Sequence, residues 1–318
     1  MSAAIKPERI LKDLAKLWVD LAKEDGEKNS AGVLRACAMT LVVAVEEQED
    51  AQAVGQTIAE LMHEHPSRAI VLHVKNESGG ELNARVFAQC WMPFGRRQQI
   101  CCEEIEITAP EPLLPDVPKL LLGLTVPDLP VVLWIRCPQM ALRAKFQRIF
   151  PLANKIIIDS DTFNDPVRGF GFVADMNRRG INVVDLAWTR LTPWREMVWH
   201  IFEDERNRPY LERITKVTIV HSGASIQVKY LTGWFEHALP EAEVVFETAS
   251  NGLSRIREIR FDAPGFTASI EIQNGTSAVL KVNDLTQTMA VPESTERALI
   301  GQELSIVGVD PVFRRSLE

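Results

Sequence analysis

Apolar residues in the first half of the chain recur in patterns that predict helices and strands in alternation. Residues 8–23 place Ile10, Leu14 and Leu17 at intervals of four and three, which predicts an amphipathic helix. A β-branched apolar run follows at 39–45, and a second helix is expected at 50–63. Further strands and one more helix are expected: strands at 69–74, 84–90, 100–107, 131–135 and 155–159, and the helix at 139–150.

This alternation predicts a layered α/β domain with a largely buried central sheet. The adjacent strands at 84–107 favour a mixed sheet over a purely parallel one. A long helical segment at 185–203 completes the domain. Pro193 lacks an amide hydrogen and must kink this segment or begin a second helix, with Thr192 before it suited to be the N-cap. Asp185 stands where it can cap the start of the segment.

The pattern changes after residue 205, which predicts a smaller, separate antiparallel α+β domain. A strand at 214–221 and a helix at 225–239 come first. Four strands are expected next, at 244–248, 256–262, 266–272 and 278–283, and a final helix at 294–304 ends the chain. Asn274-Gly275 joins the last two strands, because this dipeptide tolerates positive φ at both central positions of a tight turn. We therefore expect an N-terminal domain at 1–205 and a C-terminal domain at 206–318.

The charge and the apolar runs exclude several classes of protein. Lys and Arg total 35 against 43 Asp and Glu, a formal net charge of −8. This acidic balance argues against nucleic-acid binding, which relies on a basic surface. The N-terminal residues lack the basic and apolar regions of a secretory signal, and no apolar run approaches the length that crosses a bilayer. We expect a cytoplasmic protein with neither nucleic acid nor membrane as partner.

The five cysteines are Cys37, Cys90, Cys101, Cys102 and Cys137. An odd number without a secretory signal indicates reduced thiols and not a disulfide framework. No CxxC pair or Cys/His spacing matches a zinc site. Cys101 and Cys102 are adjacent, so in a strand their side chains point to opposite faces. Buried or half-buried free thiols are expected, and a redox-sensitive thiol is the alternative.

One glycine motif and one histidine are candidates for cofactor or metal chemistry. Gly169, Gly171 and Ala174 fit GxGxxA, which binds dinucleotides only as the turn between a strand and the helix that it opens. The nearest expected strand ends near residue 159, so we expect a glycine-containing turn instead. No P-loop and no nucleophile elbow is present, and the surroundings of His65 match no familiar metal pattern. We expect no catalytic constellation, no metal and no cofactor.

The tetrapeptide His65-Pro66-Ser67-Arg68 is expected to close one helix and open the next strand, since a residue before proline disfavours helix. Arg68 can bind an anion or satisfy carbonyl groups at the preceding helix end. Both interpretations stay open.

The most unusual segment is DLAWTRLTPWRE at 185–196, with Trp199 close behind. Trp188 and Trp194 can share one helix face, which is typical of a core stripe. Tryptophan and arginine are also the residues that anchor protein interfaces, because their burial dominates binding energy there. Arg190 and Arg195 can pair with Asp185 or Glu196.

This segment resembles the signature of the glucose-6-phosphate dehydrogenase assembly protein (OpcA) family. Two shorter segments agree with that family in order and spacing, HPSR at 65–68 and DLPVVLW at 128–134, as do Gly233-Trp234 and the ending DPVF at 310–313. The resemblance implies a non-enzymatic protein that binds glucose-6-phosphate dehydrogenase and promotes its active oligomer, supporting NADPH production. Candidates for the partner surface or its direct support are Asp185, Trp188, Arg190, Trp194, Arg195, His65 and Arg68.

Two alternatives remain open. The N-terminal α/β domain can belong to an enzyme that binds a nucleotide or a sugar phosphate. The chain can also be a scaffold for a different enzyme.

Overall fold

The computed structural model describes residues 6–28, 33–47, 49–76, 79–93, 99–223, 225–249, 256–306 and 308–318. The chain forms two compact units, one of residues 1–159 with 181–183 and one of residues 160–180 with 184–318. This division comes earlier than the boundary at 205/206 that the sequence suggests, because helices within 184–205 pack with later residues. Within the described part of the chain, no helix has both the length and the apolar character needed to cross a membrane.

The first unit is an α/β sandwich. Its strands are β1 (Val33–Arg35), β2 (Met39–Glu46), β3 (Ser67–Lys75), β4 (Asn83–Trp91), β5 (Gln99–Pro110), β6 (Val131–Ile135), β7 (Lys155–Ile158) and β8 (Val183–Asp185), the last of which runs on into the second unit. Its helices are α1 (Pro7–Lys28), α2 (Ala51–Met62), α3 (Val117–Leu124), α4 (Pro138–Ala141) and α5 (Ala144–Gln147), with 3₁₀ turns at Glu111–Asp116 and Phe150–Leu152.

The sheet order is β1-β5-β3-β2-β6-β7-β8, with β4 on the other side of β5. Strands β2, β3, β5, β6 and β7 are parallel, whereas β4 is antiparallel to β5, so the expectation of a mixed sheet is confirmed. With β1 and β4 set aside, the strands follow the order 3-2-1-4-5-6 of doubly wound dinucleotide-binding folds.

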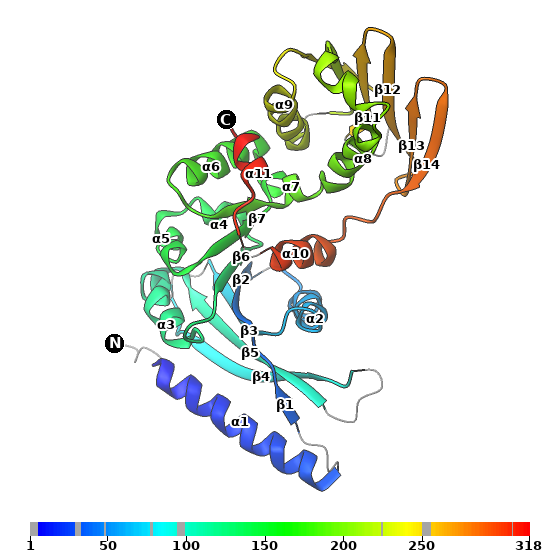
Figure 1. Ribbon diagram of the computed structural model, residues 1–318. Helices are drawn as coiled ribbons and strands as arrows, with labels where there is room; N and C mark the ends of the chain where they lie inside the picture. Colours follow the sequence, from blue (N-terminus) through cyan, green and yellow to red (C-terminus); the bar gives the residue numbers. More distant parts are fainter. Residues whose placement is uncertain are drawn as a thin grey trace. The chain divides into compact units, whose positions relative to one another are not determined.

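Strand β2 is the centre of this unit. Residues 39–45 are all buried, as expected for a parallel strand covered on both faces. In Figure 1, α1 and α3 lie on one side of the sheet and α2 on the other. The expected helix at 139–150 is wrong: two short helices stand there, because Arg143 between them is extended, with φ −82° and ψ 124°. Helix α3 was not expected.

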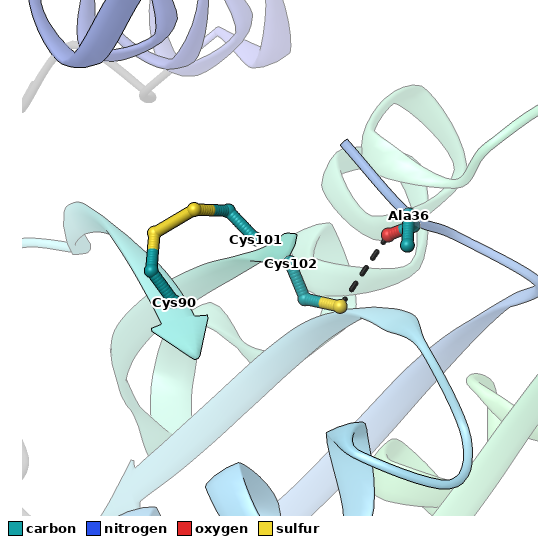
Figure 2. Close-up of a disulfide and its surroundings, with 4 residues drawn as sticks. All are labelled: Ala36, Cys90, Cys101 and Cys102. Atoms are coloured by element: carbon teal, nitrogen blue, oxygen red, sulfur yellow. Dashed lines mark hydrogen bonds between the residues drawn. A yellow bond between two sulfur atoms is a disulfide. The ribbon is translucent and has the colours of Figure 1, made fainter. Parts of the chain in front are cut away.

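The expectation that all five cysteines are reduced is wrong for two of them. Cys90 and Cys101 face each other across β4 and β5, with Cα atoms 4.1 Å apart, and form a disulfide (Figure 2). Sequence separation alone could not reveal this, since it depends on strand register. Cys102 points the other way, as expected, with Sγ 3.4 Å from the carbonyl oxygen of Ala36. Burial raises its pKa to about 11, so it is a neutral thiol at pH 7.

The other two cysteines bear out the expectation of buried or half-buried thiols. Cys37 is half-buried, and Cys137 is buried with its pKa raised by desolvation.

Reducing the Cys90–Cys101 disulfide should lower the free energy of unfolding of the first unit by about 2–3 kcal/mol. The bond closes a loop with a sequence separation of 11, and a cross-link of this size restricts the unfolded chain. Urea unfolding with and without reductant measures the effect. A Cys90→Ser/Cys101→Ser variant should unfold at the same urea concentration in both buffers. An unchanged wild-type midpoint would contradict the prediction.

The second unit combines helices with a separate sheet. Its helices are α6 (Pro166–Arg178), α7 (Leu186–Thr189), α8 (Thr192–Glu203), α9 (Ile226–Ala238), α10 (Glu296–Ser305) and α11 (Pro311–Arg315), with 3₁₀ turns at Ser160–Thr162 and Arg208–Arg213. Its strands are β9 (Lys216–His221), β10 (Glu243–Thr248), β11 (Ile256–Ala263), β12 (Phe266–Gln273), β13 (Ser277–Val282) and β14 (Leu285–Ala290).

This sheet has the order β10-β9-β11-β12-β13-β14. It is mixed and not purely antiparallel as expected, because β9 and β10 run parallel and α9 connects them. A parallel pair needs such a crossover. Asn274 and Gly275 have φ of 54° and 72°, which confirms the predicted positive-φ turn. Strand β14 and helix α11 were not expected, so the helix at 294–304 does not end the chain.

Helix α8 packs on β12 and β13, and its Phe202 ring lies against Phe261 and Phe266. A second helix begins after α7 ends, with Pro193 in its first turn, which confirms one of the two expectations. The N-cap of α8 is Leu191, not Thr192, which is already helical. The Thr192 hydroxyl accepts hydrogen bonds from Arg195 and Gln302 instead.

Candidate functional site

The carboxylate of Asp185 is the centre of the signature segment. It is fully buried, and its Oδ1 accepts hydrogen bonds of 2.9 Å from the backbone amides of Ser160 and Ala187. The bond to Ala187 confirms Asp185 as the cap of α7. Its Oδ2 accepts a 2.6 Å hydrogen bond from the hydroxyl of Tyr230 on α9. Desolvation, with the nearby carboxylate adding to it, raises the pKa of Tyr230 well above its ordinary value.

Trp188 and Arg195 form the second part of the segment. The guanidinium of Arg195 lies 3.8 Å from the centroid of the buried Trp188 ring and donates to the carbonyl oxygen of Trp188. Burial lowers the pKa of Arg195 to about 10, while Asp310 and Glu303 oppose that shift, so the side chain stays charged at pH 7. This buried cation over an indole is a cation–π contact. The closest contacts of Arg195 are thus with Trp188 and Thr192 and not with Asp185 or Glu196, although the charge of Glu196 also opposes the lowering of its pKa.

The C-terminal residues complete this core. Asp310 caps α11 with one carboxylate oxygen and accepts a 3.0 Å hydrogen bond from the Trp188 indole with the other. Gly233 on α9 lets α11 approach closely, since a Cβ at 233 would lie 2.5 Å from the carbonyl oxygen of Ser316. The Phe313 ring then reaches Trp188. The motifs around Gly233 and Asp310 thus serve the same packing.

Three residues of the segment, Arg190, Pro193 and Trp194, line a surface cavity of about 430 Å³, which we call the signature cavity. Arg190 is 25% exposed and pairs with Asp161 at 3.7 Å. Trp194 is buried and contributes one edge of the wall. The lining residues are Arg190, Pro193, Trp194, Gln227, Ile256, Ile272, Gly275 and residues 291–295. Gln227 also donates a 3.0 Å hydrogen bond to the carboxylate of Asp161, which keeps the ion-pair partner of Arg190 in place.

His65 and Arg68 lie in the first unit, apart from the five candidates of the second. The tetrapeptide does close α2 and open β3, as expected: the His65 amide donates to Leu61, and β3 starts at Ser67. Arg68 is buried, with Nε 2.6 Å from Glu103 and Nη1 2.7 Å from the carbonyl of Leu124. That carbonyl belongs to the last residue of α3. Arg68 therefore satisfies a carbonyl group at the end of α3 and not at the end of α2, the helix that precedes it in the chain.

Of the candidates, Asp185, Trp188, Arg195 and Arg68 thus make internal contacts, whereas Arg190 and Trp194 line a cavity. His65 is half-buried. Sequence reasoning passed over Tyr230, Gln227 and Asp310, because their partners are distant in sequence. Trp199 lies close to the signature segment in the sequence but was not among the predicted partner-binding residues. It stands off the apolar stripe Trp194, Met197, Val198, Ile201 and Phe202, a signal that it faces solvent.

The GxGxxA motif does not form a turn, contrary to expectation. Gly169 and Gly171 lie inside α6. A Cβ at Gly169 would stand 2.8 Å from the Phe163 ring and 3.0 Å from the carbonyl oxygen of Ser160, so this glycine permits close packing. The motif therefore has a packing role and no strand-to-helix geometry for a phosphate.

A doubly wound sheet offers a dinucleotide site at the turn after its first strand, where glycines let a pyrophosphate reach the helix amides. In this chain, the last residue of β2 and the turn that follows it carry four acidic residues and no glycine: Glu46 ends the strand, and Glu47, Glu49 and Asp50 lie in the turn. Asp50 itself accepts hydrogen bonds from the amides of Gln52 and Ala53. These residues do not fit a dinucleotide, because carboxylates repel its phosphates and one of them occupies the amides.

The same turn is held by ion pairs from neighbouring strands. Arg136 after β6 lies 2.8 Å from Glu49, and Lys75 at the end of β3 lies 3.1 Å from Glu47. Among the described residues, no group of His, Cys, Asp and Glu is arranged to hold a metal ion.

Family models match both parts of the chain. The glucose-6-phosphate dehydrogenase subunit N-terminal domain matches residues 58–175, and the C-terminal domain of that subunit matches residues 181–317. The chain belongs to the OpcA family. The second match contains Asp185, Trp188, Tyr230, Asp310 and Phe313, whereas Ser160, whose amide also donates to Asp185, lies within the first match.

Curated relatives carry the same family name. The OxPP cycle protein OpcA of Synechocystis is 28% identical over 204 residues, which are 63% of this chain and 42% of that protein. That of Nostoc punctiforme is 26% identical over 209 residues, 64% of this chain and 44% of its own length. The match thus spans less than half the length of these curated relatives.

Solved structures with a similar trace include a dehydrogenase, MviM, from Clostridium difficile, with a TM-score of 0.44 and 7% identity over 84% of this chain and 87% of that one. A super-repressor mutant of Gal80p from Saccharomyces cerevisiae has a TM-score of 0.45 and 7% identity over 85% and 83%. Scores this low carry no functional argument.

Replacing Tyr230 with Phe should lower the free energy of unfolding of the second unit by about 1–3 kcal/mol, because the buried Asp185 carboxylate loses a donor. The raised pKa of Tyr230 also stabilises the fold below about pH 10, where an unfolded tyrosine is still neutral, and this contribution is lost at higher pH. The difference in free energy of unfolding between the wild type and Tyr230→Phe should therefore become smaller above pH 10.

Denaturant unfolding at several pH values measures both effects. Tyr210→Phe is the matched control, because Tyr210 stacks on Phe266 by its ring and no hydrogen bond joins its hydroxyl to a described residue. Equal stability of wild type and Tyr230→Phe at pH 7 would refute the role of this hydroxyl.

Proposed function

We propose that this chain is a non-enzymatic factor that binds glucose-6-phosphate dehydrogenase and promotes its active oligomer in the cytoplasm. It would thereby support NADPH production by the oxidative pentose phosphate pathway. The proposal is supported by the family descriptions, which name a subunit of that dehydrogenase over both parts of the chain. The curated relatives are named for the same cycle.

The observation that carries the proposal within the fold is the signature cavity. Most buried residues of the segment 185–196 pack internally, while Arg190, Pro193 and one edge of the buried Trp194 line a concave surface. Interfaces are dominated by a few such aromatic and arginine anchors in well-supported positions. Asp185, Trp188 and Arg195 act as that support. His65 and Arg68 would support the first unit in the same indirect way.

An activator that is not itself an enzyme works by differential affinity. It must bind the active oligomer of the dehydrogenase more tightly than the inactive form, or the equilibrium does not shift. Each tenfold preference contributes about 1.4 kcal/mol to the active form. A rigid surface suits this task, since little conformational entropy is lost on binding.

Titrating glucose-6-phosphate dehydrogenase from the same organism with this chain should raise the rate saturably. A larger complex should appear on size exclusion. Arg190→Ala should raise the concentration of this chain that gives half-maximal activation about tenfold. This is the effect expected when one interface anchor that contributes more than about 1 kcal/mol is removed. No activation and no complex with the wild type would refute the proposal.

Arg179→Ala is the matched control for Arg190→Ala. Arg179 ends α6 in the same unit and pairs with Asp175 at 3.6 Å, an exposed ion pair like many others. Its loss should leave activation unchanged. Thermal unfolding of each variant separates the loss of a contact from the loss of the fold. Loss of the fold is the expected outcome for Trp194→Ala, because Trp194 is buried.

A nucleotide- or sugar-phosphate-binding enzyme is the second candidate, favoured by the 3-2-1-4-5-6 strand order. The acidic turn at 46–50 opposes it. We expect no saturable rise in melting temperature with NADP or glucose 6-phosphate when the dehydrogenase is absent. A ligand at a hundred times its Kd would stabilise the fold by about 2.7 kcal/mol, so binding would be visible. Such a rise would favour the enzyme.

A further inference from the structure

Helix α8 has an exposed tryptophan at the end away from the signature cavity. Trp199 is 64% exposed, although the stripe beside it is buried on β12 and β13. It stands one helical turn before Glu203 and so shares that side of the helix. A single exposed apolar residue is ordinary, but tryptophan is enriched among the residues that dominate binding energy, so its neighbours on the surface decide whether it marks a binding site.

The sheet of the second unit ends in two different edges. The edge strand β10 carries Glu243 and Glu247, charges of the kind that discourage another strand from pairing. At the other edge, β14 reads LTQTMA, with neither a charge nor a proline, and pairs only with β13 among the described residues. An uncharged edge strand presents backbone donors and acceptors that an extended segment can join.

A groove of about 1010 Å³ lies beside this edge. We call it the hairpin groove. From the end of α8 onward it is lined by His200, Ile201, Glu203, Asp204, Arg206, Asn207 and Tyr210, and from the β13–β14 hairpin by Leu280 and residues 282–287. Leu285 of β14 pairs with Val282, which pairs with the buried Ala268, and cross-strand partners share a face. The side chain of Leu285 therefore lies on the same face of the sheet as the buried Ala268, although Leu285 itself is 64% exposed.

The charges of the hairpin groove are mostly negative. Arg206 is already bound to Asp204, whose pKa that hydrogen bond holds at about 2. Glu203 and Asp284 remain exposed, and neither forms an ion pair with a described residue. The groove thus has two uncompensated carboxylates beside an apolar wall. A second copy of this chain would bring the same acidic residues together, which disfavours self-association.

We propose that β14 and the hairpin groove bind an extended basic segment of the partner enzyme, which joins the sheet as a further strand. Alternate side chains of that segment face the groove, since strand side chains alternate. An apolar one packs on Leu285, and a Lys or Arg reaches Glu203 or Asp284. Trp199 does not line the groove, but it lies one helical turn before Glu203 and offers a further apolar contact next to it. The inference rests on the proposed function, because it takes the dehydrogenase as partner.

The test measures the Kd of the full chain for glucose-6-phosphate dehydrogenase from the same organism. Trp199→Ala and Leu285→Ala should each raise Kd about tenfold. Phe246→Ala is the matched control, because Phe246 is also exposed but lies on the charged edge β10, and Kd should not change. Glu203→Lys/Asp284→Lys should raise Kd and flatten its dependence on salt, whereas Glu236→Lys on α9 should do neither.

The binding measurements also distinguish failure of the proposed function from failure of this inference. If the wild type does not bind the dehydrogenase, the proposed function fails and this inference fails with it. If the wild type binds and all groove variants bind equally well, only this inference is overturned. If sedimentation shows a dimer of this chain that Trp199→Ala dissociates, the occupant is a second copy and the partner segment is wrong.

Discussion

The buried carboxylate of Asp185 connects segments that are far apart in the sequence. It accepts hydrogen bonds from the turn at Ser160, the first turn of α7 and the hydroxyl of Tyr230 on α9. A buried charge is stable only when its lone pairs are satisfied, so these three elements must keep their places together. The position of α8, and with it both surface features of that helix, follows from this requirement.

The Trp188 ring extends the same network to the C-terminal residues. It lies between Arg195, Tyr230 and Phe313 and donates to Asp310. Such a cluster combines apolar burial with charge-assisted contacts, each sensitive to small displacements. A long signature in the sequence is the expected result, since Asp185, Trp188, Thr192 and Arg195 each have partners that fix their geometry. The string at 185–196 is therefore explained largely by internal packing.

Local chemistry allowed much of this fold to be predicted. Asp185 as a cap, Pro193 as the start of a helix and the turn at Asn274 each depend on neighbours in the chain. Pairings between distant residues were not predictable, such as Trp188 with Asp310, which are 122 residues apart, or Cys90 with Cys101, which depends on register. The family and its signature could be recognised, but the division of that signature into support and surface required the structure.

The unequal edges of the second sheet also limit how large an assembly can grow. A strand interface that joined edge to opposite edge would be heterologous, and repeated copies would form an open filament. The carboxylates of Glu243 and Glu247 on β10 disfavour that arrangement. Copies of this sheet are therefore not expected to join β14 to β10 in succession, so pairing at β14 would not propagate into a filament of this chain.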